Sequence, residues 1–182
     1  MTQDHTATKL NWRAVARLKT FSDRHRRYLR AILREVARYY RDNLAGLAVF
    51  GSYARGENRL NSDLDLLIIL KEAPSLGRRV AEFVEQIEMK HEALAQKMYE
   101  EEGISCDLSP YILSRTEALT LQPVYYDLAD HHIIVYDPEG LLARIIEATR
   151  KYLQGAKARK ERLGNTWEWS IEKGGFPGEV RL

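Results

Sequence analysis

The chain has 182 residues, of which 45% are hydrophobic and 30% are charged, and its formal net charge is +2. This composition is typical of a folded globular domain and excludes an intrinsically disordered chain. A single cysteine, Cys106, excludes an intrachain disulfide framework and a multi-cysteine zinc site. No apolar run approaches the ~18 residues that a membrane helix needs. The first residues, MTQDHTATKL, lack the pattern of a signal peptide, so we expect a cytoplasmic protein without a membrane partner.

The charge is unevenly distributed along the chain. Residues 1–42 carry 11 Lys and Arg against 4 Asp and Glu, a net +7, whereas the other 140 residues carry 17 against 22, a net −5. A basic helical segment can bind nucleic acid or an acidic protein, or it can be a solvated helix face. The sequence leaves all three open, and nucleic acid is not the favoured partner.

Residues 1–8 are predicted to be a disordered tail, and residues 9–182 a single domain. The domain divides into an N-terminal helical region over 9–42, a core over 46–137, and a C-terminal helix and tail over 139–182. Apolar periodicity and turn residues predict helices over 9–42 (with a second start at Ser22 and Asp23), 80–99, 116–129 and 141–154, and strands over 47–50, 63–70, 104–113, 132–137 and 165–171. Gly46 is predicted to break the first helical region, and Pro110 to mark an edge strand or a bulge. The order indicates a small mixed sheet flanked by helices, an α/β or α+β fold.

Two aspartates, Asp63 and Asp65, begin the apolar run DLDLLIIL. Residues i and i+2 of a strand face the same side, so the two carboxylates project together and repel each other. Both remain ionised at low cost when a cation lies between them, and oxygen ligands suit Mg²⁺ or Mn²⁺. The pair therefore predicts a metal site on a strand that is expected to be central in the sheet.

A phosphate-binding turn is predicted just before this pair. In FGSYARG, Gly51 lets the backbone approach a ligand closely, and Ser52 is expected to open a short helix whose amides favour phosphate. Arg55 and Arg59 are within reach of a polyphosphate, although ordinary surface positions are equally compatible with the pattern. A phosphate-binding turn and a divalent-metal pair in one window point to nucleotide chemistry.

A two-metal arrangement usually requires a third carboxylate. Asp107, within the predicted strand ISCDLSPYIL, is the preferred candidate, because its neighbours Cys106 and Leu108 would face the core if Asp107 faces a cleft. Asp127, Asp130 and Asp137 are alternatives in a helix or a turn. His131 and His132 are interpreted as packing or surface residues, although they could act as acid–base groups or ligands. Trp167 and Trp169 are interpreted as packing residues, although they could stack a base.

Gly51, Ser52, Asp63 and Asp65 form the pattern G-S, ten residues, D-x-D. This pattern resembles the nucleotidyltransferase superfamily that includes DNA polymerase beta and the kanamycin nucleotidyltransferases. The chain looks most similar to the minimal nucleotidyltransferases of prokaryotes, also on the segments CDLSPYILS, HHIIVYDPEGLLARI and GNTWEWSIEKGGFPGEV. The resemblance implies the polymerase beta-like nucleotidyltransferase fold, here with a long N-terminal helical region.

The same resemblance implies a function. Minimal nucleotidyltransferases are commonly paired with a HEPN-domain toxin, and as the antitoxin they transfer AMP from ATP to a tyrosine of the toxin. The superfamily binds two Mg²⁺ ions, and the roles that carry over are metal binding and catalysis by Asp63, Asp65 and Asp107. Nucleotide binding at Gly51, Ser52, Arg55 and Arg59 is the expectation from the phosphate-binding turn itself.

Other functions remain open at this point. One is an antibiotic-modifying nucleotidyltransferase, which would need an acidic acceptor pocket. Another is an antitoxin that masks its partner by contact alone, and a third is a nucleic-acid-binding module that uses the basic helix.

Overall fold

The computed structural model describes residues 9–163 and 166–170. The predicted tail over 1–8 and the residues after Ser170 lie outside the described residues. Across the described part, no helix is both long and apolar enough to cross a membrane.

The basic N-terminal region forms two helices, α2 (Trp12–Val15) and α3 (Asp23–Tyr40), followed by the 3-10 turn η1 (Arg41–Asn43). Ser22 is the N-cap of α3, because its hydroxyl accepts a hydrogen bond from the backbone N–H of His25 at 3.0 Å. The second helix start predicted at Ser22 and Asp23 is thereby confirmed.

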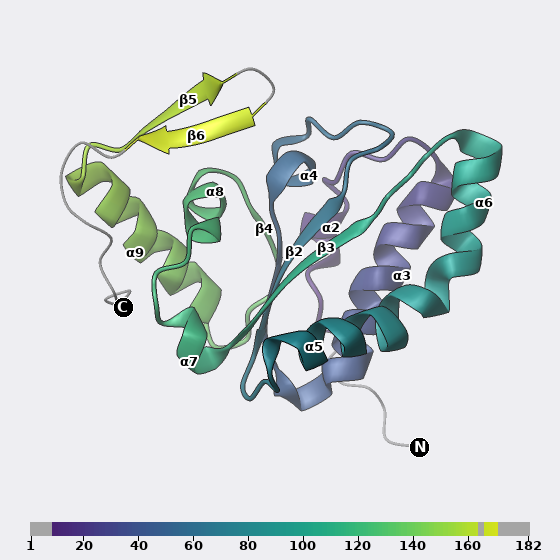
Figure 1. Cartoon of the computed structure of the whole chain (residues 1–182), viewed down its shortest axis with the longest axis horizontal. Helices are drawn as coiled ribbons and strands as arrows, with labels where there is room; N and C mark the ends of the chain where they lie inside the picture. Colours follow the sequence, from purple (N-terminus) through teal and green to yellow (C-terminus); the bar gives the residue numbers. More distant parts are fainter. Residues whose placement is uncertain (1–8, 164–165, 171–182) are drawn as a thin grey trace.

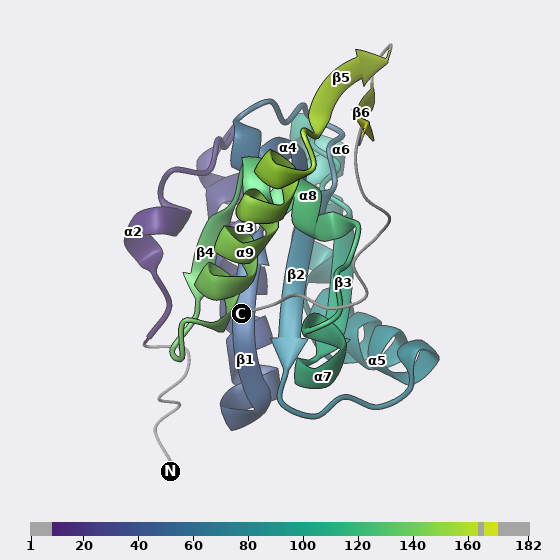
Figure 2. The ribbon, with the colours of Figure 1, turned by 90° about the vertical axis from the view of Figure 1, so that its left-hand side faces the viewer.

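The core of the molecule is a four-stranded mixed sheet (Figure 1) in the order β3-β2-β1-β4, which Figure 2 shows face-on. Its strands are β1 (Leu44–Val49), β2 (Leu64–Leu70), β3 (Leu108–Ser114) and β4 (Ile133–Tyr136). Strand β1 pairs antiparallel with β2 and β4, and β2 pairs parallel with β3. Strand β2 is central, as its almost wholly apolar sequence predicts, and β3, which contains Pro110, is one of the two edge strands.

Helices cover both faces of the sheet (Figures 1 and 2). One face packs on α3 and on the long crossover between β2 and β3, and the other on the C-terminal helices. The elements beyond β1 and outside the sheet are α4 (Gly51–Arg55), α5 (Leu76–Phe83), the π-helix η2 (Val84–Glu88), the 3-10 turn η3 (Met89–His91), α6 (Glu92–Glu102), α7 (Arg115–Ala118), α8 (Val124–Asp130), α9 (Leu141–Gly155), and the hairpin β5 (Arg159–Leu163) and β6 (Thr166–Ser170).

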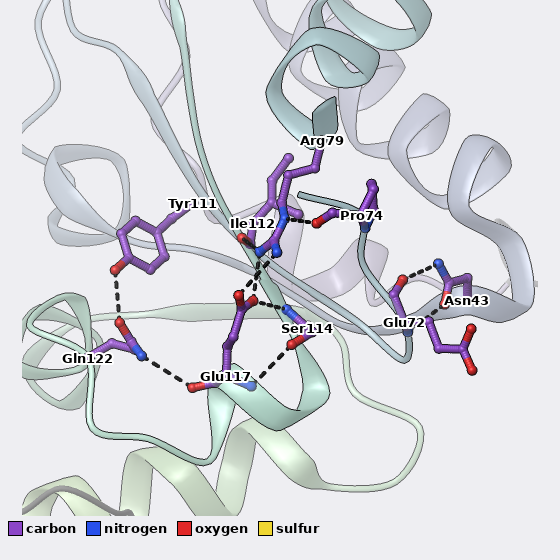
Figure 3. Close-up of polar contacts among 9 residues, drawn as sticks. All are labelled: Asn43, Glu72, Pro74, Arg79, Tyr111, Ile112, Ser114, Glu117 and Gln122. Carbon is purple, nitrogen blue, oxygen red and sulfur yellow. Dashed lines mark hydrogen bonds and ion pairs between the residues drawn. The ribbon is translucent and has the colours of Figure 1, made fainter. Parts of the chain in front are cut away.

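An ion pair fixes the sheet edge where β2 and β3 end (Figure 3). The buried guanidinium of Arg79 donates to both carboxylate oxygens of Glu117, at 2.7 and 3.1 Å, and to the carbonyl oxygens of Pro74 and Ile112. Glu117 also accepts a hydrogen bond from the backbone N–H of Ser114, completing a capping box at the start of α7. This clamp joins α5, β3 and α7 at the end of the sheet opposite Asp63 and Asp107.

Several boundaries differ from the sequence predictions. Gly46 does not end the helical region but lies inside β1. Leu142 packs against it so closely that a Cβ atom would approach the Leu142 side chain to 2.9 Å. The helix predicted over 80–99 is a succession of α, π and 3-10 segments that ends, as expected, at Gly103 in a left-handed conformation. The helix predicted over 116–129 is divided into α7 and α8. Strand β5 was not predicted.

Candidate active site

The turn after β1 brings the backbone against an aspartate of β2. Gly51 has a left-handed φ of +64°, and a Cβ atom at this position would collide with the Oδ2 atom of Asp65. The backbone N–H of Phe50 donates to the carbonyl oxygen of Asp65 at 3.1 Å. Helix α4 begins here with Gly51 and Ser52 and ends at Arg55, with Gly56 as its C-cap. Only glycine fits a position that requires both this φ and this close approach.

The two predicted metal ligands lie at the start of β2. Asp63 immediately precedes the strand and is exposed, whereas Asp65 is its second residue and is half-buried. The pKa of Asp65 is raised to about 6, chiefly because burial disfavours its charged form, and also because Asp63 and Asp127 add negative charge. A hydrogen bond from Ser109 and the charge of Arg55 oppose this shift. Asp65 therefore lies in a negative environment that a cation would relieve.

Asp107 lies at the same edge of the sheet as Asp63. It immediately precedes β3, rather than lying inside the strand as the sequence predicts. Because Leu64 is in register with Leu108, Asp63 and Asp107 precede neighbouring parallel strands, and the N–H of Leu64 donates to the Asp107 carbonyl oxygen at 2.7 Å.

The alternation around Asp107 matches the expectation from the sequence. Asp107 is exposed, Cys106 is buried in the core and Leu108 packs against it. Within residues 9–163 and 166–170, however, no three His, Cys, Asp or Glu side chains converge closely enough to form a metal site. The structure thus places Asp63 just before β2, Asp65 within β2, and Asp107 just before the adjacent strand β3.

The two arginines predicted to bind phosphate differ in their surroundings. Arg55, the last residue of α4, is largely buried, pairs with Glu57 at 2.9 Å and lies near enough to Asp65 to lower its pKa. Arg59 is exposed in the loop after α4, where its backbone N–H donates to the Ser62 hydroxyl at 2.8 Å. Of the two arginines, Arg55 is therefore the one that lies near Asp65.

The alternative carboxylates have other partners. Asp127 and Asp130 both accept from the Lys160 ammonium group, at 3.2 and 2.7 Å. Asp137 accepts from the backbone N–H groups of Leu142 and Ala143, which makes it a cap of α9. The negative charge of Asp127 nevertheless contributes to the raised pKa of Asp65.

The remaining side chains that the sequence singled out are engaged in packing or local contacts. His131 pairs with Asp130 at 3.1 Å, and burial lowers the pKa of His132, whose Nδ1 lies 2.7 Å from the carbonyl oxygen of Leu128. Trp169 packs edge-on against Tyr126, with the Lys160 ammonium 5.4 Å from its ring centre. The side chain of Trp167 is outside the described part of the chain.

A buried polar chain behind the site was not predicted. His25, Tyr53 and Cys106 are buried, with His25 Nε2 2.9 Å from the Tyr53 hydroxyl and that hydroxyl 3.3 Å from Cys106 Sγ. The N–H of Phe21 donates to Nδ1 of His25, so Nε2 carries the proton of the neutral ring and donates to Tyr53. Tyr53 follows Ser52 and Cys106 precedes Asp107. This series of hydrogen bonds therefore connects α4 and the residues before β3 to His25 of α3.

Comparison with known proteins identifies the family. The model of the nucleotidyltransferase domain matches residues 29–138, which is more than half of the chain. The chain belongs to the nucleotidyltransferase domain family. The match includes α4 and all four strands of the sheet, β1 to β4, and therefore every residue predicted for the site.

Two curated relatives of this nucleotidyltransferase domain come from Methanocaldococcus jannaschii, and both carry the name "putative protein adenylyltransferase". They are 32% and 37% identical over 63 and 60 residues, which is 34% and 32% of this chain and 64% of each relative. The match thus spans less than two thirds of either relative's length.

Three solved structures resemble the nucleotidyltransferase domain at low identity. A spectinomycin adenyltransferase from Enterococcus faecialis with ATP and spectinomycin has a TM-score of 0.49 at 13% identity, over 72% of this chain and 68% of the other. A toxin–antitoxin structure with AMP-PNP has a TM-score of 0.38 at 17% identity, over 68% and 88%. A tri-AMPylated Shewanella oneidensis HEPN toxin in complex with its MNT antitoxin has a TM-score of 0.34 at 14% identity, over 68% and 84%.

Proposed function

We propose that this nucleotidyltransferase transfers AMP from ATP, with Mg²⁺, to a hydroxyl group, namely a tyrosine of a HEPN-type toxin, and thereby acts as an antitoxin. The observation that carries the proposal is the contact between the Gly51 backbone and the Asp65 carboxylate. It brings a turn suited to phosphate beside a pair of carboxylates suited to a cation.

The residues fit a divalent metal ion. Asp65 is half-buried, the nearby charge of Asp63 contributes to its raised pKa, and both side chains offer the oxygen ligands that Mg²⁺ and Mn²⁺ prefer. Asp63 and Asp65 would hold Mg²⁺, and Asp107 would join them for a second ion. The ions would neutralise charge on the triphosphate and on the reacting oxygens.

The chain's own groups would bind and orient the reactants. The backbone amides of Gly51 and Ser52, the Ser52 hydroxyl and the Arg55 guanidinium would bind phosphate oxygens. The acceptor oxygen attacks the α-phosphorus and forms a new P–O bond, while the bond to the bridging oxygen breaks and pyrophosphate leaves. Asp107, exposed at the same edge, would take the proton of the acceptor hydroxyl.

A protein acceptor is supported by the names of the curated relatives and by the resemblance to minimal nucleotidyltransferases. An acidic hollow favours a second class of acceptor. It has a volume of about 370 Å³ and is lined by Asp107, Glu88, Glu92 and the exposed Tyr99, among others. Such a lining suits a hydroxylated cation, as in antibiotic-modifying nucleotidyltransferases.

Co-expression with a HEPN-type protein and intact-mass measurement tests the proposal. The partner should gain about 329 Da for each adenylyl group that is transferred. The variant Asp63→Asn with Asp65→Asn should fold and leave the partner's mass unchanged. If the partner is neutralised without added mass, and equally by the double variant, masking by contact replaces the enzymatic proposal. Transfer to aminoglycosides but to no protein would favour the antibiotic-modifying function.

A further inference from the structure

Helix α3 carries a row of arginines on its solvent side. The row consists of Arg26, Arg27, Arg30, Arg34 and Arg38, of which Arg30 is half-buried and the others are exposed. Arg26, Arg30 and Arg34 are four residues apart, so they share one side of the helix at steps of about 6 Å, and the whole row is about 18 Å long. It is therefore a regular line of positive charge on a rigid element.

Two of these guanidinium groups are held in place by an aromatic ring. The Cζ atoms of Arg30 and Arg34 lie 4.6 and 5.4 Å from the ring centre of Trp12 in α2. This contact leaves their N–H donors available while it restricts the side chains. Less conformational entropy is then lost when a ligand binds.

A hollow lies between α2 and the start of α3. Its volume is about 360 Å³. Its polar lining consists of Arg26, Arg30 and Thr20, and its apolar lining of Val15, Ala16, Leu18 and Leu29. Two guanidinium groups and a hydroxyl at one hollow form a donor-rich wall that suits a phosphate group.

Two acidic side chains of the described residues pair with members of the row, Asp23 with Arg26 and Glu35 with Arg38. Asp23 pairs with Arg26 at 2.9 Å, but both side chains are exposed, at 78% and 59%. Glu35 accepts from Lys90 at 3.0 Å and lies 3.7 Å from Arg38. Within residues 9–163 and 166–170, no acidic side chain forms an ion pair with Arg27, Arg30 or Arg34.

The large hydrophobic side chains that are exposed in the described part of the chain lie on other elements. The large hydrophobic residues that are exposed in the described part of the chain are Leu60, Leu76, Val80, Val84, Met89, Tyr99, Tyr111 and Leu119. None of them belongs to α2 or α3. A stable protein interface needs an apolar centre, so the arginine row suits a ligand that is bound by charge and hydrogen bonds, and an acidic protein is the weaker candidate.

We propose that the arginine row of α3, together with the hollow at Arg26 and Arg30, binds the phosphate backbone of single-stranded RNA. Guanidinium forks match phosphate geometry, and a flexible strand can follow a straight row and enter the hollow, whereas a rigid duplex touches a convex helix at few phosphates. Thr20 offers a hydrogen-bonding partner for a 2′-hydroxyl group. This binding needs neither ATP nor the aspartates and is independent of the proposed transfer.

Fluorescence anisotropy with a labelled, unstructured 20-nucleotide RNA tests the proposal on the full chain between 50 and 200 mM salt. The variants are Arg26→Gln with Arg30→Gln and, because Arg30 contacts Trp12, also Arg26→Gln with Arg27→Gln. The control, Arg78→Gln with Arg144→Gln, removes the same charge from exposed positions on α5 and α9. Each α3 variant should lose about tenfold in affinity, and its salt slope should fall by about 1.4, which corresponds to two phosphate contacts; the control should bind like the original protein.

Three results would overturn the proposal. The first is no RNA binding at 100 mM salt, and the second is an equal loss in the control variant, which would indicate an unspecific charge effect. The third is a competitor that displaces the labelled RNA as well as unlabelled RNA does. If polyglutamate does so, the ligand of the row is an acidic protein; if DNA of the same length does so, the row has no preference for RNA.

Discussion

At the scale of single residues, Gly51 is the position on which the site depends most directly. It combines a left-handed φ with a Cβ position that Asp65 occupies, and Gly56 at the other end of α4 provides a matched comparison. Gly56 has φ +71°, but no atom lies within 4 Å of its Cβ position.

Gly51→Ala and Gly56→Ala should therefore each lose more than about 1 kcal/mol of stability, because alanine is strained at positive φ. Only Gly51→Ala should also abolish binding of a non-hydrolysable ATP analogue with Mg²⁺, since only it displaces the Asp65 carboxylate. Thermal unfolding and calorimetry measure the two effects. Equal nucleotide affinity in both variants would show that the contact with Asp65 is irrelevant to binding.

Asp65 gives a second prediction at this scale, from the direction of its pKa shift. Its folded-state pKa of about 6 exceeds the ordinary value of 3.8, so the charged form costs stability. The penalty is absent below pH 3.8 and grows as the pH rises to about 6. In metal-free protein, Asp65→Asn should therefore raise the Tm by a few degrees at pH 8 and hardly change it at pH 4. A lower Tm at pH 8 would contradict this account.

At the scale of elements, the clamp between Arg79 and Glu117 connects α5, β3 and α7. The hydrogen bond from Arg79 is the main cause that lowers the pKa of Glu117 to about 2, and bonds from Ser114 contribute. For an acid with a lowered pKa, the stabilisation is present above its ordinary pKa of 4.5 and is lost as the pH falls towards 2.

Glu117→Gln should lower the Tm by several degrees at pH 7, since each kcal/mol corresponds to about 2–4 °C in a chain of this size. The difference should shrink as the pH falls through the range from 4.5 to about 2. Glu139→Gln is the control, because Glu139 pairs with Arg115 between two exposed side chains at 45% and 42% and should change the Tm little. A pH-independent effect of Glu117→Gln would assign its role to packing or capping alone.

The elements also show which features sequence patterns can and cannot predict. Ser22 before a helical apolar stripe and the alternation in DLDLLIIL are local signals, and they predicted the start of α3 and the central strand. Gly46 was wrongly predicted as a break, because the close packing of Leu142 that favours glycine there is a tertiary contact. Strand β5, RKERL, is polar and pairs only with β6, so no apolar alternation marked it.

At the scale of the whole molecule, the fold places the turn at Gly51 against Asp65 and sets Asp63 and Asp107 before neighbouring strands at the same end of the sheet. The spacing of Gly51, Ser52, Asp63 and Asp65 predicted the family, because it reflects a strand–turn–helix–strand unit that is local in sequence. The adjacency of Asp107 depends on the parallel pairing of β2 with β3 across a long crossover. The chain from His25 through Tyr53 to Cys106 joins three distant segments, and no pattern indicated it.

The measurement that most directly tests nucleotidyl transfer uses ATP labelled at either end of the triphosphate, with Mg²⁺ and a co-purified HEPN-type partner. Attack at the α-phosphorus retains the α-phosphate in the product and releases the other two as pyrophosphate. The proposed reaction predicts that label from [α-³²P]ATP enters the partner, that label from [γ-³²P]ATP appears in pyrophosphate, and that Asp63→Asn with Asp65→Asn abolishes both. Incorporation of the γ-label, or α-label transfer that survives the double substitution, would contradict the account.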